Sequence, residues 1–430
     1  MCQRRRGGRF DSGIDGVGTP PRSCVEMKNK GGMMFETVEE YPVDPIMIGA
    51  EYFAQDPRQD KLDLTVGIYQ DAAGKTPVLK AVKAAEQRLV NIQTSKSYLA
   101  LTGDATYCRV LGETILGSDL FDGFVAAQTA GGAVALRVMA DLLAQMPNRP
   151  TVWVQTPTYG NYIPILTAAH ARFEMLPFYD TITRNILFDQ MLEGLCEARS
   201  GDVVLLQGVC HNPTGADMTE AQFDALLDVL EARGLVPWID LAYLGFSQGF
   251  DQDCAMARKI ANRFPECIIC VTLSKTFGIY RDRAGALLIK TRPNDTARIH
   301  RAVSAIVRSS ASHAPDHGPA VVRMILQDQD LKALWLDELD HMRQRVIAVR
   351  SEIVRCEEQE FGRTDLSYLG RQSGMFSLLP LSSEQELALT RDHAIHVVKG
   401  GRINVARLSA ADIPTLITAV HAVLGKVSLR

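Results

Sequence analysis

Short, unbroken runs of apolar residues alternate with stretches of helical periodicity between about residues 131 and 290. Runs without polar positions are typical of strands buried on both faces, and their alternation with helices predicts an α/β domain with a mainly parallel sheet. Pro237 lies inside the third run and weakens that strand prediction, because proline cannot donate to a central ladder. The four clearest runs are residues 152–154, 203–209, 235–239 and 268–273.

One helix, between the second and third runs, has clear start and stop signals. Thr219 and Gln222 have the spacing of a capping box, and Gly234 follows the last periodic residue. We expect this helix to cross over between two parallel strands. Its apolar positions, spaced i, i+3, i+4 and i+7, are Phe223, Leu226, Leu227 and Leu230.

The two ends of the chain follow different patterns. Residues 1–33 are rich in glycine and arginine and lack the apolar core of a signal peptide, so we expect them to be disordered. A long amphipathic stretch at 335–354, followed by strand-like pieces at 375–379 and 402–405, predicts a smaller α+β domain. The expected boundaries are 1–33 for the extension, 34–76 for an arm and part of the small domain, 77–327 for the large domain and 328–430 for the rest of the small domain.

Composition argues against several classes of protein. The 430 residues carry a net charge of -4, which gives no basic surface for nucleic acid, and no apolar run approaches the roughly 18 residues that span a membrane. The nine cysteines are scattered without the spacing of a disulfide framework, which favours reduced thiols and a cytoplasmic location. Cys267 and Cys270 form a C-x-x-C pattern, but we expect a buried strand there instead of the helix start typical of a redox pair.

Polar residues follow three of the apolar runs. Asn212 comes after the second run, Asp240 and Tyr243 after the third, and Ser274 and Lys275 after the fourth. Ligands of open α/β sheets gather at the carboxyl ends of the strands, so we expect these side chains to meet. An amine, a carboxylate, an amide and a phenol at one sheet edge match the needs of a pyridoxal cofactor. Each signal alone is weak, since Asn-Pro-x-Gly is also a common turn and a lysine after a strand is often solvated.

These polar residues belong to a series of short motifs that follow one another along the chain. The motifs are residues 66–69, 76–78, 131–136, 211–215, 240–243, 274–280 with Arg283, and 401–406. In this order the chain resembles the class I aminotransferases of the aspartate and aromatic-amino-acid type, from about residue 34 to the C-terminus. The resemblance implies fold type I, with a mainly parallel seven-stranded sheet in the large domain and a smaller α+β domain. It also implies pyridoxal 5′-phosphate, ping-pong transfer of an amino group from an acidic or aromatic L-amino acid to 2-oxoglutarate, and a homodimer with shared active sites.

The resemblance assigns catalytic tasks around the cofactor ring. Lys275 is expected to form the Schiff base and to carry the proton from the substrate Cα, as base and then acid. Asp240 is expected to keep the pyridine nitrogen protonated, so that the ring withdraws electrons. Tyr243 and Asn212 are expected to donate to the phenolic oxygen, and Tyr159 to stack on the ring.

The phosphate and the substrate have their own expected residues. Backbone amides at a helix start bind anions, which fits the helical run after Gly131, Gly132 and Ala133. Arg402 is expected to bind the substrate α-carboxylate as a bidentate pair. The remaining assignments from the resemblance are Ser274, Arg283 and the neighbouring subunit's Tyr98 at the phosphate, Gly67 near the substrate, and Arg308, from the second subunit, at a side-chain carboxylate.

Four positions depart from the family pattern, all near the substrate or the ring. Tyr159 stands where tryptophan is usual, and Tyr162 where a histidine often supports the pyridinium-binding aspartate, with His211 a candidate to replace part of that support. Ala133 replaces a hydroxyl residue. His313 replaces a polar residue near the distal carboxylate site, and these changes predict an altered donor preference.

Two other interpretations remain open, and a third is disfavoured. β-Elimination from a sulfur amino acid would use the same Lys275 and Asp240, and only the role of Arg308 separates it from transamination. A regulatory protein that senses the cofactor would usually carry a DNA-binding domain ahead of this one, and residues 1–33 are too few for that. His313 and His317 have helical spacing for a metal, but Pro315 breaks such a helix, so we predict no metal site.

Overall fold

The computed structural model describes residues 34–40 and 45–425. The chain divides into two units between residues 44 and 45, so that residues 34–40 belong to the first unit and residues 45–425 to the second. In the first unit the structure describes a short 3-10 helix, η2 Met34–Thr37. The predicted disorder of residues 1–33 lies outside the described residues. The second unit holds the sheet and all the residues expected to form the site.

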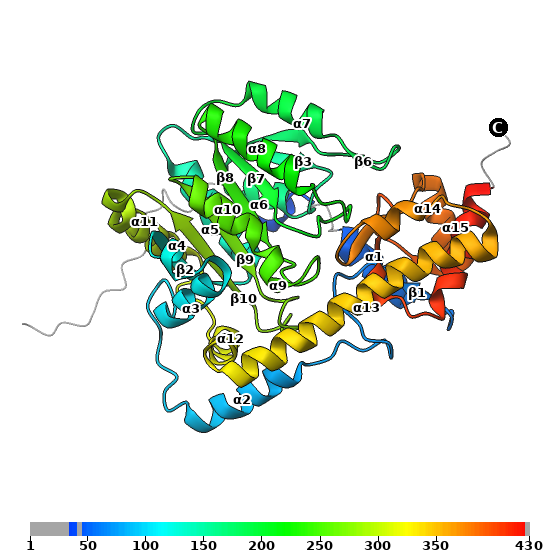
Figure 1. Cartoon of the computed structure of the whole chain (residues 1–430), viewed down its shortest axis with the longest axis horizontal. Helices are drawn as coiled ribbons and strands as arrows, with labels where there is room; N and C mark the ends of the chain where they lie inside the picture. The colour runs from blue at the N-terminus through cyan, green and yellow to red at the C-terminus, as the bar shows by residue number, and fades with distance from the viewer. Residues whose placement is uncertain (1–33, 41–44, 426–430) are drawn as a thin grey trace, which may run out of the picture. The chain divides into compact units, whose positions relative to one another are not determined.

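A seven-stranded sheet forms the centre of this unit, in the order β2-β10-β9-β8-β7-β3-β4 (Figure 1). The pairings of β3 with β4 and β7, of β7 with β8, and of β8 with β9 are parallel, whereas β10 runs antiparallel to both of its neighbours. The mainly parallel sheet predicted from the sequence is therefore confirmed. The strands are β2 Phe124–Ala130, β3 Thr151–Thr156, β4 Arg172–Pro177, β7 Val203–Gln207, β8 Val236–Leu241, β9 Cys267–Thr272 and β10 Ala284–Lys290.

Pro237 does not interrupt β8, although a proline there weakened the prediction of that strand. It is the second residue of β8 and pairs with Val204 of β7. On the other side, the ladder with β9 begins only at Trp238, opposite Ile268. The missing amide of Pro237 therefore costs no bond in that ladder.

Alternate residues of the central strands enter two different cores. Val203 and Leu205 pack with the helices on one face, whereas Val204 and Leu206 pack with those on the other. This burial on both faces explains why the strands are continuously apolar. The first face is covered by α5 Gly132–Gln145, α6 Tyr162–Ala168 and α11 Thr296–Ser310, and the second by α3 Ala105–Leu116, α7 Phe188–Gly194, α8 Glu220–Arg233, α10 Ala255–Arg263 and α12 His317–Gln327.

Helix α8 is the predicted crossover between β7 and β8. The Thr219 side chain accepts a hydrogen bond from the Gln222 amide, and the Gln222 side chain accepts one from the Thr219 amide. Gly234 ends the helix in the left-handed conformation, with φ of 64°. The capping box and the glycine stop predicted from the sequence are both confirmed.

The C-terminal part is built on α13 Gln329–Phe361, which is longer than the amphipathic stretch suggested. The helix runs from contacts with α2 and α12 to contacts with α15 and the last 3-10 helices (Figure 1). The two predicted strand pieces pair with each other as β11 and β13. The elements here are α2 Lys80–Ile92, η5 Ser367–Arg371, β11 Phe376–Leu378, α14 Ser383–His393, β12 Ile395–His396, β13 Arg402–Asn404, η6 Val405–Arg407 and α15 Asp412–Gly425.

Short elements complete the described chain. β1 pairs with β12 and β5 with β6. The short elements are α1 Pro45–Gln55, β1 Leu62–Asp63, α4 Ser118–Phe121, β5 Tyr179–Asp180, β6 Asn185–Ile186, η3 Leu195–Glu197, α9 Phe250–Asp253 and η4 Pro293–Asp295.

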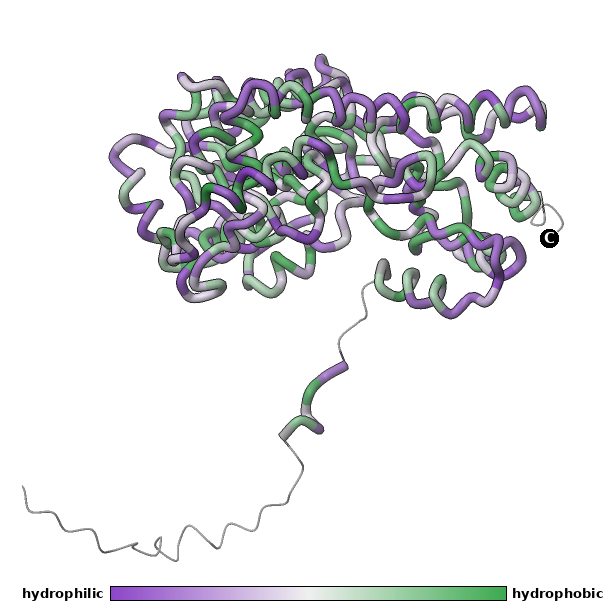
Figure 2. Tube along the Cα trace, turned by 90° about the horizontal axis from the view of Figure 1, so that it is seen from below, coloured by the Kyte–Doolittle hydropathy of each residue, from purple (hydrophilic) through white to green (hydrophobic). Residues whose placement is uncertain are grey.

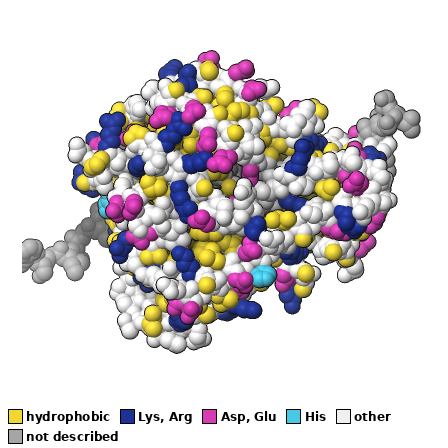
Figure 3. All heavy atoms as spheres, viewed as in Figure 1, with side chains coloured by type: hydrophobic (Ala, Val, Ile, Leu, Met, Phe, Trp, Pro, Cys, Tyr) yellow, Lys and Arg dark blue, Asp and Glu magenta, His cyan; other side chains and the backbone are white. Residues whose placement is uncertain are grey.

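Hydrophobic and hydrophilic segments are distributed as expected for a domain with buried cores. In Figure 2, hydrophobic segments lie mainly inside this unit and hydrophilic ones around it. Figure 3 shows acidic and basic side chains interspersed on one face.

The structure bears on the predictions for the C-x-x-C pattern and for membrane-spanning segments. Cys267 and Cys270 lie in the fully buried strand β9, as predicted, and burial raises the pKa of the Cys267 thiol to about 12. A thiol with so high a pKa is a poor nucleophile, which agrees with a structural role. Among the described residues, no helix has both the length and the apolarity needed to cross a membrane.

Candidate active site

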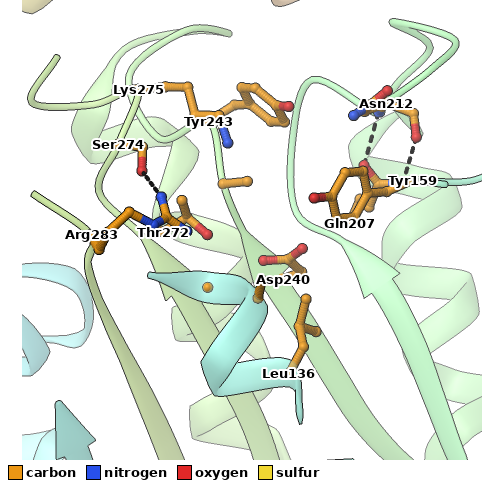
Figure 4. A pocket seen from close by; sticks show the side chains of 13 residues that line it. Leu136, Tyr159, Gln207, Asn212, Asp240, Tyr243, Thr272, Ser274, Lys275 and Arg283 are labelled. Atoms are coloured by element: carbon orange, nitrogen blue, oxygen red, sulfur yellow. Dashed lines mark hydrogen bonds between the residues drawn. The ribbon is translucent and has the colours of Figure 1, made fainter. Parts of the chain in front are cut away.

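A cavity of about 150 Å³ opens where β7, β8 and β9 end (Figure 4). These three strands are parallel neighbours, so their carboxyl ends share one edge of the sheet. The structure thus brings together the polar residues that follow three separate apolar runs. The cavity is lined by Gly132, Ala133, Leu136, Tyr159, Gln207, Asn212, Asp240, Ala242, Tyr243, Thr272, Ser274, Lys275 and Arg283.

Lys275 and Asp240 carry opposite charges on facing parts of the cavity wall. The Lys275 side chain is partly exposed to the cavity, but protein surrounds its amine, and this burial lowers the pKa of Lys275 to about 8. Burial likewise raises the pKa of Asp240 to about 6, opposed by a hydrogen bond from Tyr162 and by the positive charge of Lys275. Each group thus has a pKa closer to neutrality than usual, as is common at sites that move protons.

The two oxygens of Asp240 have different surroundings. Oδ2 accepts a hydrogen bond of 2.7 Å from the Tyr162 hydroxyl, whereas Oδ1 is buried without a hydrogen-bond partner. A buried carboxylate oxygen without a donor is costly, so Oδ1 is suited to a donor supplied by a ligand. A protonated ring nitrogen in the cavity would meet that need.

Asn212 is held by a residue that the sequence analysis missed. The Gln207 side chain accepts a hydrogen bond of 2.8 Å from the backbone N–H of Asn212 and donates one of 2.9 Å to the backbone carbonyl of Asn212 (Figure 4). Gln207 has the one polar side chain in the run 203–209, and that exception could have drawn attention to it. Tyr243 lies on the lysine side, with its ring centroid 5.2 Å from Lys275 Nζ.

His211 does not support Asp240, contrary to the suggestion from its position in the sequence. Its Nδ1 lies 2.9 Å from the Thr214 hydroxyl, and its ring packs on Phe178 with centroids 4.4 Å apart. Burial lowers the pKa of His211 to about 3, so the ring is neutral at physiological pH. Tyr162, from the start of α6, holds the aspartate instead.

The start of α5 forms a close-fitting end of the cavity. A Cβ on Gly132 would lie 1.8 Å from Thr272 Oγ1, so a larger residue cannot fit between α5 and β9. Gly131 has φ of 79°, and a Cβ there would lie 2.7 Å from Arg283 Nη2. The first turn of a helix beside a guanidinium and the Ser274 hydroxyl, 3.3 Å from Arg283 Nη1, can bind a phosphate. Thr272 adds a hydroxyl that the sequence analysis missed.

Arg402 lies in β13, next to Asn212 of the cavity wall. Its Nη1 is 3.4 Å from Asn212 Oδ1, and its Nη2 donates to the Thr65 carbonyl at 2.7 Å. The guanidinium also covers the ring of Phe376, at 4.6 Å from the centroid. A Cβ on Gly67 would lie 3.0 Å from that same ring, which makes Phe376 the wall shared by Gly67 and Arg402. Phe376 was not singled out from the sequence.

Tyr98 and Arg308 do not line the cavity of their own chain. Tyr98 is 87% exposed and stacks on His313, with ring centroids 4.8 Å apart. Arg308 is exposed near the end of α11 and donates to the Ser312 hydroxyl at 2.7 Å. Their roles in a neighbouring subunit stay predictions.

His313 and His317 do not share a helix. Helix α11 ends at Ser310, and α12 begins at His317. The helical spacing that would have suggested a metal is therefore absent from this described segment, as the position of Pro315 predicted.

Comparison with known proteins gives a consistent result. The family model for aminotransferase class I and II matches residues 59–420. The tyrosine aminotransferase of Rhizobium meliloti (strain 1021) is 40% identical over 384 residues, which cover 88% of this chain and 97% of that protein. The aspartate aminotransferase of Escherichia coli (strain K12) is 37% identical over 396 residues, covering 91% of this chain and all of that protein.

Solved structures agree with the sequence matches. The crystal structure of an aromatic-amino-acid aminotransferase from Burkholderia pseudomallei, covalently bound to pyridoxal phosphate, superposes with a TM-score of 0.88. It is 35% identical, and the match covers 91% of this chain and 100% of that chain. The cytoplasmic aspartate aminotransferase of Saccharomyces cerevisiae is 25% identical, also with a TM-score of 0.88, and the match covers 92% and 99% of the two chains.

Proposed function

Because this chain belongs to the class I and II aminotransferases, in the aspartate and aromatic-amino-acid branch, we propose that it moves an α-amino group from an acidic or aromatic L-amino acid to 2-oxoglutarate. The cofactor in this proposal is pyridoxal 5′-phosphate, and the reaction is ping-pong. The observation that carries it is the meeting of Lys275, Asp240, Asn212 and the start of α5 around one cavity.

The cavity residues fit pyridoxal phosphate on structural grounds. Asp240 Oδ1 has no hydrogen-bond donor, and a protonated pyridine nitrogen would supply one. Gly132 allows α5 to begin in close contact with Thr272 of β9, and backbone amides at such a helix start can bind the phosphate. When bound, the cofactor supplies an aldehyde that joins the amino group and a ring that withdraws electrons from the neighbouring carbon. In this proposal Asn212 and Tyr243, which line the cavity, donate to the ring's phenolic oxygen, and Tyr159, also in the lining, stacks on the ring.

Lys275 is the group that moves the proton. A pKa of about 8 leaves a useful fraction of the amine in its basic form near neutral pH. In that form Nζ can accept the proton from the Cα of the amino acid, and as the conjugate acid it would then deliver this proton to the C4′ carbon of the bound cofactor, the carbon that carries the amino group. The Tyr243 ring lies beside Nζ and restricts the conformations that the Lys275 side chain can adopt.

Arg402 binds and orients the amino acid. Its position over Phe376, with one nitrogen on the Thr65 carbonyl, fixes the plane of the guanidinium. A fixed guanidinium can bind the α-carboxylate through two parallel hydrogen bonds, which places the Cα at the lysine. In the proposed homodimer, Arg308 and Tyr98 of each subunit complete the partner's site.

Substitution of the lysine tests the proposal. Lys275→Ala should lower the rate of amino transfer to 2-oxoglutarate at least roughly a thousand-fold, because both the covalent attachment and the proton transfer are lost. The matched control is Lys83→Ala, which removes an exposed lysine of α2 that pairs only with Glu86 among the ion pairs of the described chain. Wild-type turnover by Lys275→Ala, across aspartate, tyrosine, phenylalanine and tryptophan as donors, would refute the proposal.

The same assay separates transamination from β-elimination. Elimination would release a 2-oxo acid from a sulfur amino acid without any 2-oxoglutarate. Transamination needs the acceptor for more than one turnover. Sustained product formation without acceptor would therefore favour the alternative.

A further inference from the structure

Tyr162 connects two walls of the cavity, although it does not itself line it. It is the first residue of α6 and is 2% exposed. Its hydroxyl donates to Asp240 Oδ2 at 2.7 Å. Its ring meets Tyr159 edge to face, with centroids 5.3 Å apart and planes at 89°. The two tyrosines that depart from the family pattern are thus in direct contact.

The hydrogen bond from Tyr162 decides which oxygen of Asp240 is available. With Oδ2 occupied, only Oδ1 is left without a donor, and Asp240 lies on the cavity wall. A carboxylate held at one oxygen cannot rotate freely about its terminal bond. Its second oxygen therefore keeps one direction, which is the requirement for a short hydrogen bond to a rigid ring.

Resting on the function proposed above, we propose that Tyr162 is a positioning residue that holds Asp240 and Tyr159 as one support for the cofactor ring. Asp240 would hold the ring nitrogen, and Tyr159 would stack on the ring. One side chain between them sets their relative positions, so that a shift of either affects the other.

A phenol gives a support that does not change with pH. Burial and the neighbouring Asp240 raise the pKa of Tyr162 well above its usual value, so its hydroxyl keeps its proton through the physiological range. The groups around Asp240 that bear charge or titrate are Tyr162, Tyr243, Lys275 and Cys270. Burial also keeps the Tyr243 hydroxyl and the Cys270 thiol protonated by raising their pKa values. A histidine at residue 162 would instead change its own charge near neutral pH.

The test uses cofactor binding as well as turnover. Tyr162→Phe keeps the ring and its contact with Tyr159 but removes the donor to Asp240. We expect the dissociation constant of pyridoxal phosphate, measured by titrating the cofactor-free protein, to rise about ten-fold or more, as for the loss of a hydrogen bond to a charged group. The pH midpoint of the bound cofactor's absorbance change should shift, and kcat should fall more than KM rises.

Two further variants keep the result interpretable. Tyr107→Phe is the matched control, because it removes the hydroxyl of another buried tyrosine, which donates to the Gly285 carbonyl at 3.0 Å outside the cavity lining. It should lower the melting temperature without shifting the pH midpoint of the bound cofactor's absorbance change. Tyr162→His restores a donor, so it should recover most of the affinity but add a second pH-dependent step. If Tyr162→Phe does not fold, Tyr162→His carries the test: a second pH-dependent step supports the role of Tyr162, and its absence overturns that role.

The outcomes separate this inference from the proposed function. Unchanged cofactor affinity and an unchanged pH midpoint in folded Tyr162→Phe would overturn the role of Tyr162, while wild-type protein still transaminates. A wild-type protein that takes up no pyridoxal phosphate would overturn the proposed function, and the role of Tyr162 with it.

Discussion

The cavity wall and the exposed surface around Tyr98 present the predicted site residues in opposite ways. Asp240, Asn212 and Tyr243 are buried, and neighbours within the chain hold each of them: Asp240 and Asn212 through hydrogen bonds and Tyr243 through its ring contact with Phe376. Tyr98 and Arg308 lie on the surface, and their contacts within the chain are a stacked His313 and a hydrogen bond to Ser312. In our proposal the chemical step depends on the first group, and the choice of substrate depends partly on the second.

This difference indicates where the chain can change without losing its reaction. A buried polar group that loses its partner carries a desolvation cost, so the cavity wall tolerates few substitutions. Exposed side chains carry no such cost. Of the four departures from the family pattern, Tyr162 keeps a hydrogen bond to Asp240, whereas His313 is half-buried and stacks on the exposed ring of Tyr98.

After Lys275→Ala, the largest effect within the cavity should come from Asp240→Asn. The amide keeps the shape of the carboxylate but not the charge that stabilises a protonated ring nitrogen, so kcat should fall about a hundred- to a thousand-fold. The control is Asp202→Asn. Asp202 is also buried, but it accepts from Thr151 and Trp153 just before the amino end of β7, whereas the cavity lies at the carboxyl end of that strand. Its variant should lose stability and keep its kcat; equal kcat losses would remove the contrast between the two acids.

A smaller effect that depends on the donor is expected from Arg308→Leu. Loss of a cation that binds a side-chain carboxylate should reduce kcat/KM for aspartate and glutamate roughly ten-fold or more beyond the loss for phenylalanine. Arg301→Leu is the control, since Arg301 is exposed on the same helix and lies two turns earlier. If all donors lose activity equally, Arg308 does not select for acidic substrates.

The smallest effect concerns stability of the cofactor-free protein. The pKa of Lys275 is about 8 in the folded chain and about 10.5 when unfolded, so between these pH values the unfolded chain binds more protons. Stability contributed by this group therefore rises with pH from about 8 to 10.5 and is lowest below pH 8. Water in the open cavity reduces the effect to about 1 kcal/mol. Lys275→Met should flatten this rise in urea unfolding, whereas Lys83→Met should leave it unchanged.

Much of the fold could be predicted because burial leaves a clear pattern in this sequence. The runs that became β7, β8 and β9 are apolar except near their carboxyl ends, since each strand is covered on both faces. The capping box and Gly234 mark both ends of α8. The family resemblance identified Lys275, Asp240 and Asn212 by their motifs. The division into large and small domains and the roles of the site residues remain predictions.

Other features could not be predicted from the sequence, because they depend on contacts between distant segments. Gln207 holds Asn212, and Phe376 packs under Arg402, without any motif of their own. His211 looked as suitable as Tyr162 to support Asp240, until the fold directed its ring toward Thr214 and Phe178.

The sequence by itself determined the class of fold, the strands and helices that compose it, and the residue types that a pyridoxal enzyme needs. Local patterns suffice for these, because burial and capping act on neighbouring residues. Only the tertiary structure decided that β7, β8 and β9 end side by side, that Asp240 keeps one oxygen without a donor, and that Tyr162 joins Asp240 to Tyr159. Tyr162 and Asp240 are 78 positions apart in the chain, and only the packing of α6 against the sheet sets the distance between them.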